Sequence, residues 1–383
     1  MAPTSPILAG LATYPFVRLE EAKRAVRASG IELADFGVGD PREGAPAFVR
    51  DALVAALDGV AGYPQAQGLP ELRAAIAAWC QRRFGAELDP GREIIPTLGS
   101  KEAIFGLAQV VVDARGGRDL VVVTEPGYPV PERGALFAGA QTLRLPLLEE
   151  NDFLPQLDAL DEATWRRVAL VWVNYPNNPT GATAPRAYLE QLASLAREHD
   201  VVLAADEAYS ELWFDEPAAS VLELADRRNV IAFNTLSKRS GMTAYRSGFA
   251  AGDPELVAAL RAFRPTVGTA PQEFVQRASI AAWDDEQHVD AMRERYREKR
   301  ALVLNVLARK GLRVLGSRAT MYLWVSVPEG ETSESFAARL LERGVVVAPG
   351  TFFGAAGDGY VRFALVPSLD DCRRGAAMLE AAL

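Results

Sequence analysis

Residues 201–238 read VVLAADEAYSELWFDEPAASVLELADRRNVIAFNTLSK, and this stretch decides the fold. It contains two runs, Val201–Asp206 and Val230–Asn234, that are almost continuously apolar. Such runs are typical of strands that are buried on both faces of a parallel sheet. Each run leads into a polar cluster, at Asp206 and around Lys238, and open parallel sheets bind ligands at the carboxyl ends of their strands. The stretch therefore predicts a buried sheet with a ligand site at one edge.

The same pattern continues on both sides of this stretch. Leu120–Thr124 and Val168–Asn174 are two further apolar runs, separated by segments long enough for crossover helices. Helical spacing of apolar residues occurs in five segments: Phe16–Ser29, Pro46–Leu57, Leu69–Phe84, Lys101–Val112 and Glu286–Lys310. Weaker strand patterns follow at Met321–Val327 and Tyr360–Leu365.

We therefore expect an α/β protein with two domains. The large domain has a mostly parallel sheet covered by helices on both sides, and the smaller domain is α+β. The predicted division places an N-terminal arm and part of the small domain in residues 1–44. The large, cofactor-binding domain takes residues 45–280, and the small C-terminal domain takes residues 281–383.

Composition narrows the classes of partner. The chain has 383 residues, 49% of them apolar, and a formal net charge of −9 without long basic runs. This balance argues against nucleic acid or an anionic membrane as the main partner. Cys80 and Cys372 stand alone, and neither His199 nor His288 has companions at metal-ligand spacing, so no metal site is predicted. No segment reaches the roughly 20 apolar residues that span a bilayer, and we expect a cytoplasmic protein.

Asp206 and Lys238 are the two residues with the clearest chemical meaning. A carboxylate at the end of a buried strand is costly unless a cation or several donors meet it, and a protonated pyridine nitrogen is such a cation. The alternative is that Asp206 caps a helix or anchors a loop. A lysine amine forms Schiff bases with pyridoxal phosphate (PLP) and with carbonyl substrates, although an isolated loop lysine is most often a surface residue.

Two further features suit a phosphate group. Arg246, followed by Ser247 and Gly248, can offer a bidentate guanidinium, and Gly99-Ser100-Lys101 at a helix start can offer backbone N–H groups and a hydroxyl. A surface ion pair and a simple helix cap are the alternatives. Taken together, these residues at neighbouring strand ends are the parts that a PLP site requires.

Four motifs in this order resemble the class I/II aminotransferases of fold type I: YPNNPTG (175–181), ADEAY (205–209), TLSKRSGMTAYRSG (235–248) and YVRFAL (360–365). The resemblance covers nearly the whole chain and implies PLP as the cofactor. It implies that Lys238 carries PLP as a Schiff base and shuttles the proton in catalysis, and that Asp206 keeps the pyridine nitrogen protonated.

The resemblance also implies how the rest of the cofactor is held. Asn178 and Tyr209 contact the ring hydroxyl, and Tyr128 stacks on the ring. The phosphate contacts are implied to come from Ser100, the Lys101 backbone, Thr235, Ser237, Arg246 and, from a second subunit, Tyr63. A homodimer with shared active sites follows.

For the substrate, the resemblance implies that Arg362 binds the α-carboxylate. The full implied set of substrate contacts is Gly39, Asn178, Arg362 and, for a distal carboxylate across the subunit interface, Arg264. Within the family, segments such as GDPREGAP (39–46) and PTLGSKEAIF (96–105) most resemble succinyldiaminopimelate aminotransferases of lysine biosynthesis. The implied reaction exchanges an amino group between glutamate or 2-oxoglutarate and N-succinyl-2-amino-6-ketopimelate.

Other functions share these residues. Aminotransferases for aspartate, alanine or LL-diaminopimelate keep the same cofactor set, and so does a PLP-dependent carbon–sulfur β-lyase. A PLP-binding transcriptional regulator would need an additional N-terminal DNA-binding domain, for which no room precedes the resemblance. A nicotinamide dehydrogenase would need Gly-x-Gly-x-x-Gly after the first strand, and the glycines at 354, 357 and 359 have the wrong spacing and position.

Overall fold

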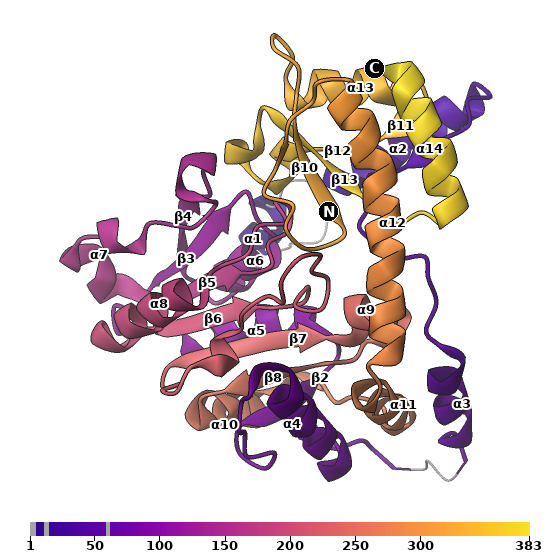
Figure 1. The fold of residues 1–383 in the computed structure, drawn as a ribbon. Helices are drawn as coiled ribbons and strands as arrows, with labels where there is room; N and C mark the ends of the chain where they lie inside the picture. The colour runs from indigo at the N-terminus through magenta and orange to yellow at the C-terminus, as the bar shows by residue number, and fades with distance from the viewer. Residues whose placement is uncertain (1–4, 11–14, 59–61) are drawn as a thin grey trace.

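The computed structural model describes residues 5–10, 15–58 and 62–383 (Figure 1). Its larger sheet has seven strands in the order β2-β8-β7-β6-β5-β3-β4. All neighbours are parallel except β8, which runs antiparallel to both β2 and β7. The strands are β2 (Ile94–Thr97), β8 (Gly248–Gly252), β7 (Val230–Thr235), β6 (Val202–Asp206), β5 (Val168–Asn174), β3 (Leu120–Glu125) and β4 (Gln141–Pro146).

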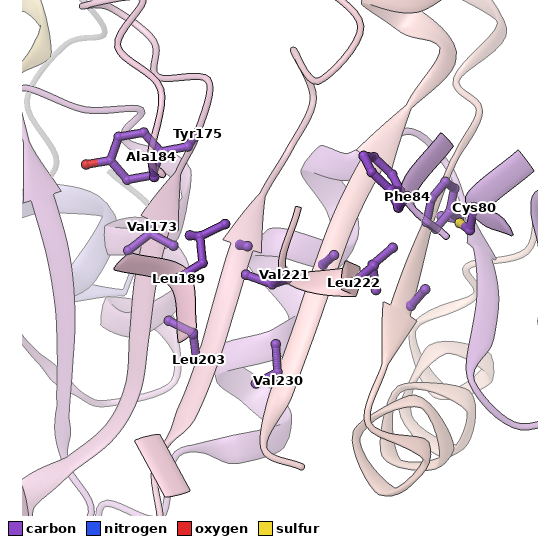
Figure 2. Close-up of a cluster of buried hydrophobic side chains, with 14 of the residues drawn as sticks. Cys80, Phe84, Val173, Tyr175, Ala184, Leu189, Leu203, Val221, Leu222 and Val230 are labelled. Atoms are coloured by element: carbon purple, nitrogen blue, oxygen red, sulfur yellow. The ribbon is translucent and has the colours of Figure 1, made fainter. Parts of the chain in front are cut away.

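Both faces of this sheet are buried, as the apolar runs predict. In β5, Leu170 and Trp172 enter one buried cluster, whereas Val171 and Val173 enter the other. Figure 2 shows Val173, Leu203 and Val230 in the second cluster, which helices on that side cover. The helices around the sheet are α3 (Ala47–Ala55), α4 (Pro70–Phe84), α5 (Ser100–Val111), α6 (Val130–Phe137), α7 (Glu162–Arg167), α8 (Arg186–Glu198), α10 (Pro254–Phe263) and α11 (Glu273–Asp284).

The smaller α+β part has a four-stranded antiparallel sheet in the order β12-β13-β10-β9. Its strands are β12 (Ala348–Pro349), β13 (Tyr360–Ala364), β10 (Tyr322–Ser326) and β9 (Val314–Leu315). A parallel pair, β1 (Ala34–Asp35) with β11 (Val345–Val346), joins N-terminal residues to this part. The associated helices are α2 (Pro15–Ala28), α13 (Ser333–Glu342) and α14 (Leu369–Ala382), and a short helix α1 (Pro6–Gly10) precedes them.

One long helix, α12 (Gln287–Arg309), runs from the level of the larger sheet to the smaller part, where it packs on α14 (Figure 1). The predicted α/β fold with a mostly parallel sheet is confirmed. The division at residues 44 and 280 stays a prediction, supported by the positions of the two sheets in the sequence. No described helix has the length and apolar character needed to cross a membrane.

Candidate active site

A cavity of about 470 Å³ lies at the carboxyl ends of the parallel strands. Its wall includes Asn174, Asp206 and Thr235, which are the last residues of β5, β6 and β7. The smaller part closes the cavity with Tyr322 from β10 and Arg362 from β13. The topology therefore brings together residues as far apart in the sequence as Phe16 and Arg362.

Most of the residues predicted for the site line this one cavity. They are Gly39, Ser100, Lys101, Tyr128, Asn178, Asp206, Tyr209, Thr235, Ser237, Lys238, Arg246 and Arg362. Their shared location supports one site, while the role of each residue stays a prediction. Among the described residues, no group of three or more His, Cys, Asp and Glu side chains could hold a metal ion.

Asp206 is a buried carboxyl group that faces the cavity and is only 6% exposed. Burial raises its pKa from 3.8 to about 6, and the Ala208 N–H, which donates to Oδ1 at 3.2 Å, opposes this only in part. No neighbouring cation of the described chain contributes to its pKa. Asn174 fixes the end of the strand, because its Nδ2 donates to the Asp206 carbonyl at 2.7 Å. Asp206 is thus a carboxylate prepared to receive a cationic ligand.

Lys238 sits in the short helix α9 (Leu236–Arg239) directly after β7. Its Nζ donates to the Gly39 carbonyl at 2.9 Å. Burial lowers its pKa from 10.5 to about 8, with the charge of Asp40 opposing and the charges of Arg362 and Arg246 adding to the decrease. A lysine with this pKa has a substantial neutral fraction near neutral pH, which both a nucleophile and a general base need.

The start of α5 forms a corner of the cavity in which several hydrogen-bond donors gather. Gly99, with φ at 69°, precedes the helix, and no side chain of the described residues caps its first N–H groups. Arg246 lies so close to Gly99 that a Cβ there would be 2.5 Å from Nη2. Thr235 and Ser237 add two hydroxyl groups that are hydrogen-bonded to each other at 2.9 Å. Helix N–H groups, hydroxyls and a guanidinium together match a phosphate group.

Arg362 is 2% exposed and is held from several directions. Its Nη1 donates to Asn178 Oδ1 at 2.8 Å, and its Nη2 donates to the Gly37 carbonyl at 3.0 Å. The guanidinium carbon lies 4.2 Å from the ring centroid of Tyr322 and 4.5 Å from that of Phe353. The aromatic walls exclude water and orient the guanidinium plane, which favours bidentate binding of a carboxylate.

Tyr322 is a site residue that the sequence did not reveal. Its hydroxyl lies 2.9 Å from the Tyr209 hydroxyl, and a Cβ at residue 39 would be 2.2 Å from it. Glycine at 39 is therefore required for close approach of the backbone. Tyr322 lies inside an apolar strand pattern, with no polar cluster to mark it. Asn174 was visible within a polar cluster, but nothing in the sequence assigned it to Asp206.

Tyr63 and Arg264 do not line the cavity of their own chain. Tyr63 is fully exposed. Arg264 is 1% exposed, and its guanidinium donates to Glu102 Oε1 at 2.9 Å and to the Ala66 carbonyl at 2.8 Å. Both residues were predicted to act across a subunit interface, so these roles stay predictions, and Arg264 is already bound within its own chain.

Residues 31–379 match the family model described as aminotransferase class I and II, and the chain belongs to this family. It is 40% identical to an LL-diaminopimelate aminotransferase of Nitratidesulfovibrio vulgaris over 96% of this chain and 95% of that protein. A crystal structure of an aminotransferase from Neisseria meningitidis has a TM-score of 0.92 at 36% identity, with 99% of each chain covered. A probable N-succinyldiaminopimelate aminotransferase from Thermus thermophilus has a TM-score of 0.89 at 35% identity, covering 96% of this chain and all of the other.

The family is PLP-dependent, and the cavity fits this cofactor. Asp206 would offer a buried carboxylate to the pyridine nitrogen, and the corner at Gly99 and Arg246 would offer donors to the phosphate. Lys238 offers an amine with a lowered pKa. The chain is therefore a PLP-dependent aminotransferase, and the residues of this cavity fit the cofactor.

Proposed function

We propose that this aminotransferase moves an amino group between LL-diaminopimelate and 2-oxoglutarate, with Lys238 moving the proton at the α-carbon. The observation that carries the assignment of residues is the meeting of Lys238, Asp206 and Arg362 in one cavity. The choice of substrate is supported by the 40% identical relative named for LL-diaminopimelate. The N-succinyl derivative is the second candidate, supported by the structural relative from Thermus thermophilus.

Bound PLP supplies an electron-withdrawing ring that stabilises negative charge at the substrate α-carbon. Lys238 would hold the cofactor before the substrate arrives and then accept the α-proton as a neutral amine. Its pKa of about 8 favours both roles, because the amine can lose and regain a proton near neutral pH. Asp206 would keep the pyridine nitrogen protonated, and Asn178 and Tyr209 would contact the ring hydroxyl.

Arg362 would orient the substrate by its α-carboxylate. The guanidinium is fixed before binding by Asn178 and the Gly37 carbonyl, so little side-chain freedom is lost when the carboxylate arrives. A fixed α-carboxylate places the α-carbon in a defined position relative to Lys238. Proximity of this kind accounts for a large share of enzymatic rate enhancement.

Asp40 supports a substrate with a distal ammonium group. It lines the cavity, is exposed, and exerts its charge on Lys238. A carboxylate in the wall attracts the second amino group of LL-diaminopimelate and disfavours the side-chain carboxylate of aspartate. N-succinylation replaces that ammonium by an amide and adds a carboxylate, so Asp40 favours the unmodified amino acid.

We also propose that two copies of the chain form a homodimer. A hollow of about 710 Å³ beside the active-site cavity shares Lys101 and Arg246 with it. Its wall includes Leu8, Phe137 and Val267, which are large exposed apolar side chains. A second copy that covers this hollow would remove apolar surface from water and would bring Tyr63 of the partner subunit towards the phosphate corner.

The substrate proposal is tested with the purified PLP-loaded enzyme and 2-oxoglutarate. LL-diaminopimelate, N-succinyl-LL-diaminopimelate, aspartate and alanine are compared by kcat/KM for glutamate formation. The highest value should belong to LL-diaminopimelate, and D40N should reduce its advantage over the N-succinyl form. A higher value for any other donor would refute the substrate assignment. Release of a thiol, pyruvate and ammonia from a cysteine conjugate without any added 2-oxo acid would instead indicate the β-lyase.

The dimer proposal is tested by light scattering and by mixing two weak variants, K238A and Y63A. In a dimer with shared sites, a mixed pair has one cavity with both Lys238 and the partner's Tyr63, so mixing should restore activity. A monomeric mass, or mixtures no more active than the separate variants, would contradict shared sites.

A further inference from the structure

The segment from Gly37 to Gly44, here called the acceptor segment, lies between β1 and α3 and contains no helix or strand. Two of its carbonyls accept hydrogen bonds from cationic side chains that line the cavity. The Gly37 carbonyl accepts from Arg362 Nη2 at 3.0 Å, and the Gly39 carbonyl accepts from Lys238 Nζ at 2.9 Å. The position of this segment therefore bears on both the proposed substrate-binding arginine and the proposed catalytic lysine.

Few polar contacts hold the acceptor segment in place. Within residues 38–44 of the described chain, the backbone makes one local hydrogen bond, from the Asp40 N–H to the Val38 carbonyl. Arg42 pairs with Asp35 at 3.8 Å through a side chain that is half exposed. A pair at this distance, with an exposed guanidinium, contributes little to conformational order.

The firm anchor is Glu43, which forms an ion pair with Lys299 of α12. The Lys299 side chain is 1% exposed, and the Glu43 carboxylate is its ion-pair partner. The backbone at Glu43 also packs closely, since a Cβ at residue 241 would lie 2.7 Å from the Glu43 carbonyl. The other carboxylate oxygen, Oε2, is buried without a hydrogen-bond partner among the described residues.

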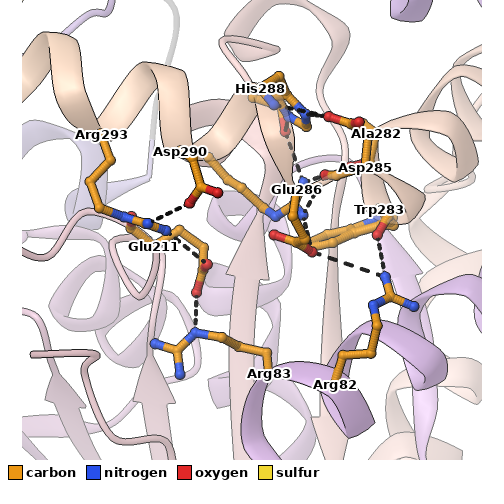
Figure 3. Close-up of polar contacts among 12 residues, drawn as sticks. Arg82, Arg83, Glu211, Ala282, Trp283, Asp285, Glu286, His288, Asp290 and Arg293 are labelled. Atoms are coloured by element: carbon orange, nitrogen blue, oxygen red, sulfur yellow. Dashed lines mark hydrogen bonds and ion pairs between the residues drawn. The ribbon is translucent and has the colours of Figure 1, made fainter.

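The same helix also contacts the segment that directly follows Lys238. His288, in the first turn of α12, has Nε2 2.8 Å from the hydroxyl of Ser240, two residues after Lys238. Asp285 holds the other ring nitrogen at 2.6 Å, within the polar network at the base of α12 (Figure 3). Lys299 follows His288 by eleven residues, or roughly 16 Å along the helix. Helix α12 thus contacts both Ser240, close to Lys238, and Glu43 of the acceptor segment.

We propose that Glu43 and Lys299 are positioning residues, which hold the acceptor segment so that the Gly39 carbonyl meets the amine of Lys238. This inference rests on the proposed role of Lys238. Glu43 and Lys299 do not line the active-site cavity and were not among the predicted site residues. The charged groups that act on the Lys238 amine are Asp40, Arg362 and Arg246. Of these, Asp40 is carried by the acceptor segment itself and would move with it.

The test compares K299M, E43Q and the double variant E43Q/K299M with the wild-type enzyme. K299R keeps the pair and should behave as wild type. R309M is the matched control, because Arg309 lies on the same helix and its ion pair with Glu380 is exposed. The neutral double variant is included because it leaves no unpaired buried charge and so avoids the main cause of misfolding.

We expect kcat to fall by about tenfold to a hundredfold with a smaller change in KM. The reason is that Gly37, which contacts Arg362, is also held by its own N–H to Asp35 Oδ1 at 3.0 Å. In the cofactor-free protein, competitive labelling of the Lys238 amine at different pH values should give a lower pKa in the variants. The physical reason is that the Gly39 carbonyl and Asp40 both favour the ammonium form.

A folded double variant with the wild-type kcat and the wild-type labelling profile of Lys238 would overturn the positioning role. Equal effects of R309M and K299M would also overturn it, because they would indicate a general effect of charge on α12. Failure of the underlying proposal is recognised separately, since K238A would then retain turnover.

Discussion

Replacing Asp206 by Asn should stabilise the cofactor-free protein and weaken its binding of PLP. The pKa of Asp206 is raised from 3.8 to about 6 by burial, which corresponds to about 3 kcal/mol of cost for the charged form. At pH 7.5 the wild-type carboxyl is ionised in both the folded and the unfolded chain, so the folded state bears this full cost. An amide at the same place bears none of it.

The sign of the pH dependence follows from the raised pKa. As pH falls from about 6 to 4, Asp206 takes up a proton in the folded protein. In the unfolded chain it stays ionised until the pH approaches 3.8. The wild type therefore recovers stability as pH decreases, and its difference from D206N should shrink from about 3 kcal/mol at pH 7.5 to below about 1 kcal/mol at pH 4.

With PLP present the order reverses, because a pyridinium cation compensates the buried carboxylate. Removing one partner of a buried charge pair costs about 3–5 kcal/mol, so D206N should bind PLP at least about a hundredfold more weakly. Urea unfolding of the cofactor-free protein and spectroscopic titration with PLP measure the two effects. E207Q is the control, because Glu207 is the neighbouring buried carboxyl, bound to Ser220 and the Val221 N–H and outside the cavity lining. Unchanged PLP affinity in D206N, or equal loss in E207Q, would refute the reasoning.

Three further predictions concern the substrate and the chemistry. R362K keeps the charge but loses the planar fork, and kcat/KM should fall about tenfold to a hundredfold for the amino acid and for 2-oxoglutarate, since both carry the carboxylate; an unchanged kcat/KM for either would contradict this. In G39A the new Cβ meets the Tyr322 hydroxyl, so kcat/KM should decrease, and G39A/Y322F should regain part of the loss. Activity of G39A equal to wild type would argue against the close approach. K238A should abolish transamination, and a folded K238A enzyme with full turnover would remove the central assignment.

The central strands were predictable from the sequence because both of their faces are buried. Apolar runs located β3, β5, β6 and β7 to within about a residue of their observed bounds. The outer strands carry a weaker signal. β4 is an edge strand with partly exposed side chains, and β8 both begins and ends with glycine, so neither has a continuous apolar run. Antiparallel β8 consequently had no counterpart among the predicted strands.

Cavity-lining residues were predictable where polar side chains directly follow a buried strand. Asp206 and Lys238 stand next to buried strands, and ordered motifs added Asn178 and Arg362. Tyr322 was not predicted, because its place in the cavity wall comes from tertiary contacts with Tyr209 and Gly39 and not from a local sequence pattern. Arg264 shows the same dependence on tertiary contacts. Its ion pair with Glu102 within its own chain could not be predicted from the surrounding sequence.

Asp206 and Lys238 illustrate why this cavity is built for ligands and not for its own stability. Burial disfavours the charged form of each, raising one pKa and lowering the other, although an ion pair between them would have satisfied both. Instead, the strand ends and the Gly39 carbonyl hold the two groups apart, on different neighbours. Separated in this way, the Asp206 carboxylate lacks a cationic partner and the Lys238 amine is partly neutral. A cofactor with a cationic ring nitrogen and an electrophilic carbon would provide a partner for each. Cofactor binding should then raise the stability of the fold and lower the pKa of Asp206 towards its ordinary value at the same time, which ties the folding free energy to the chemistry of the site.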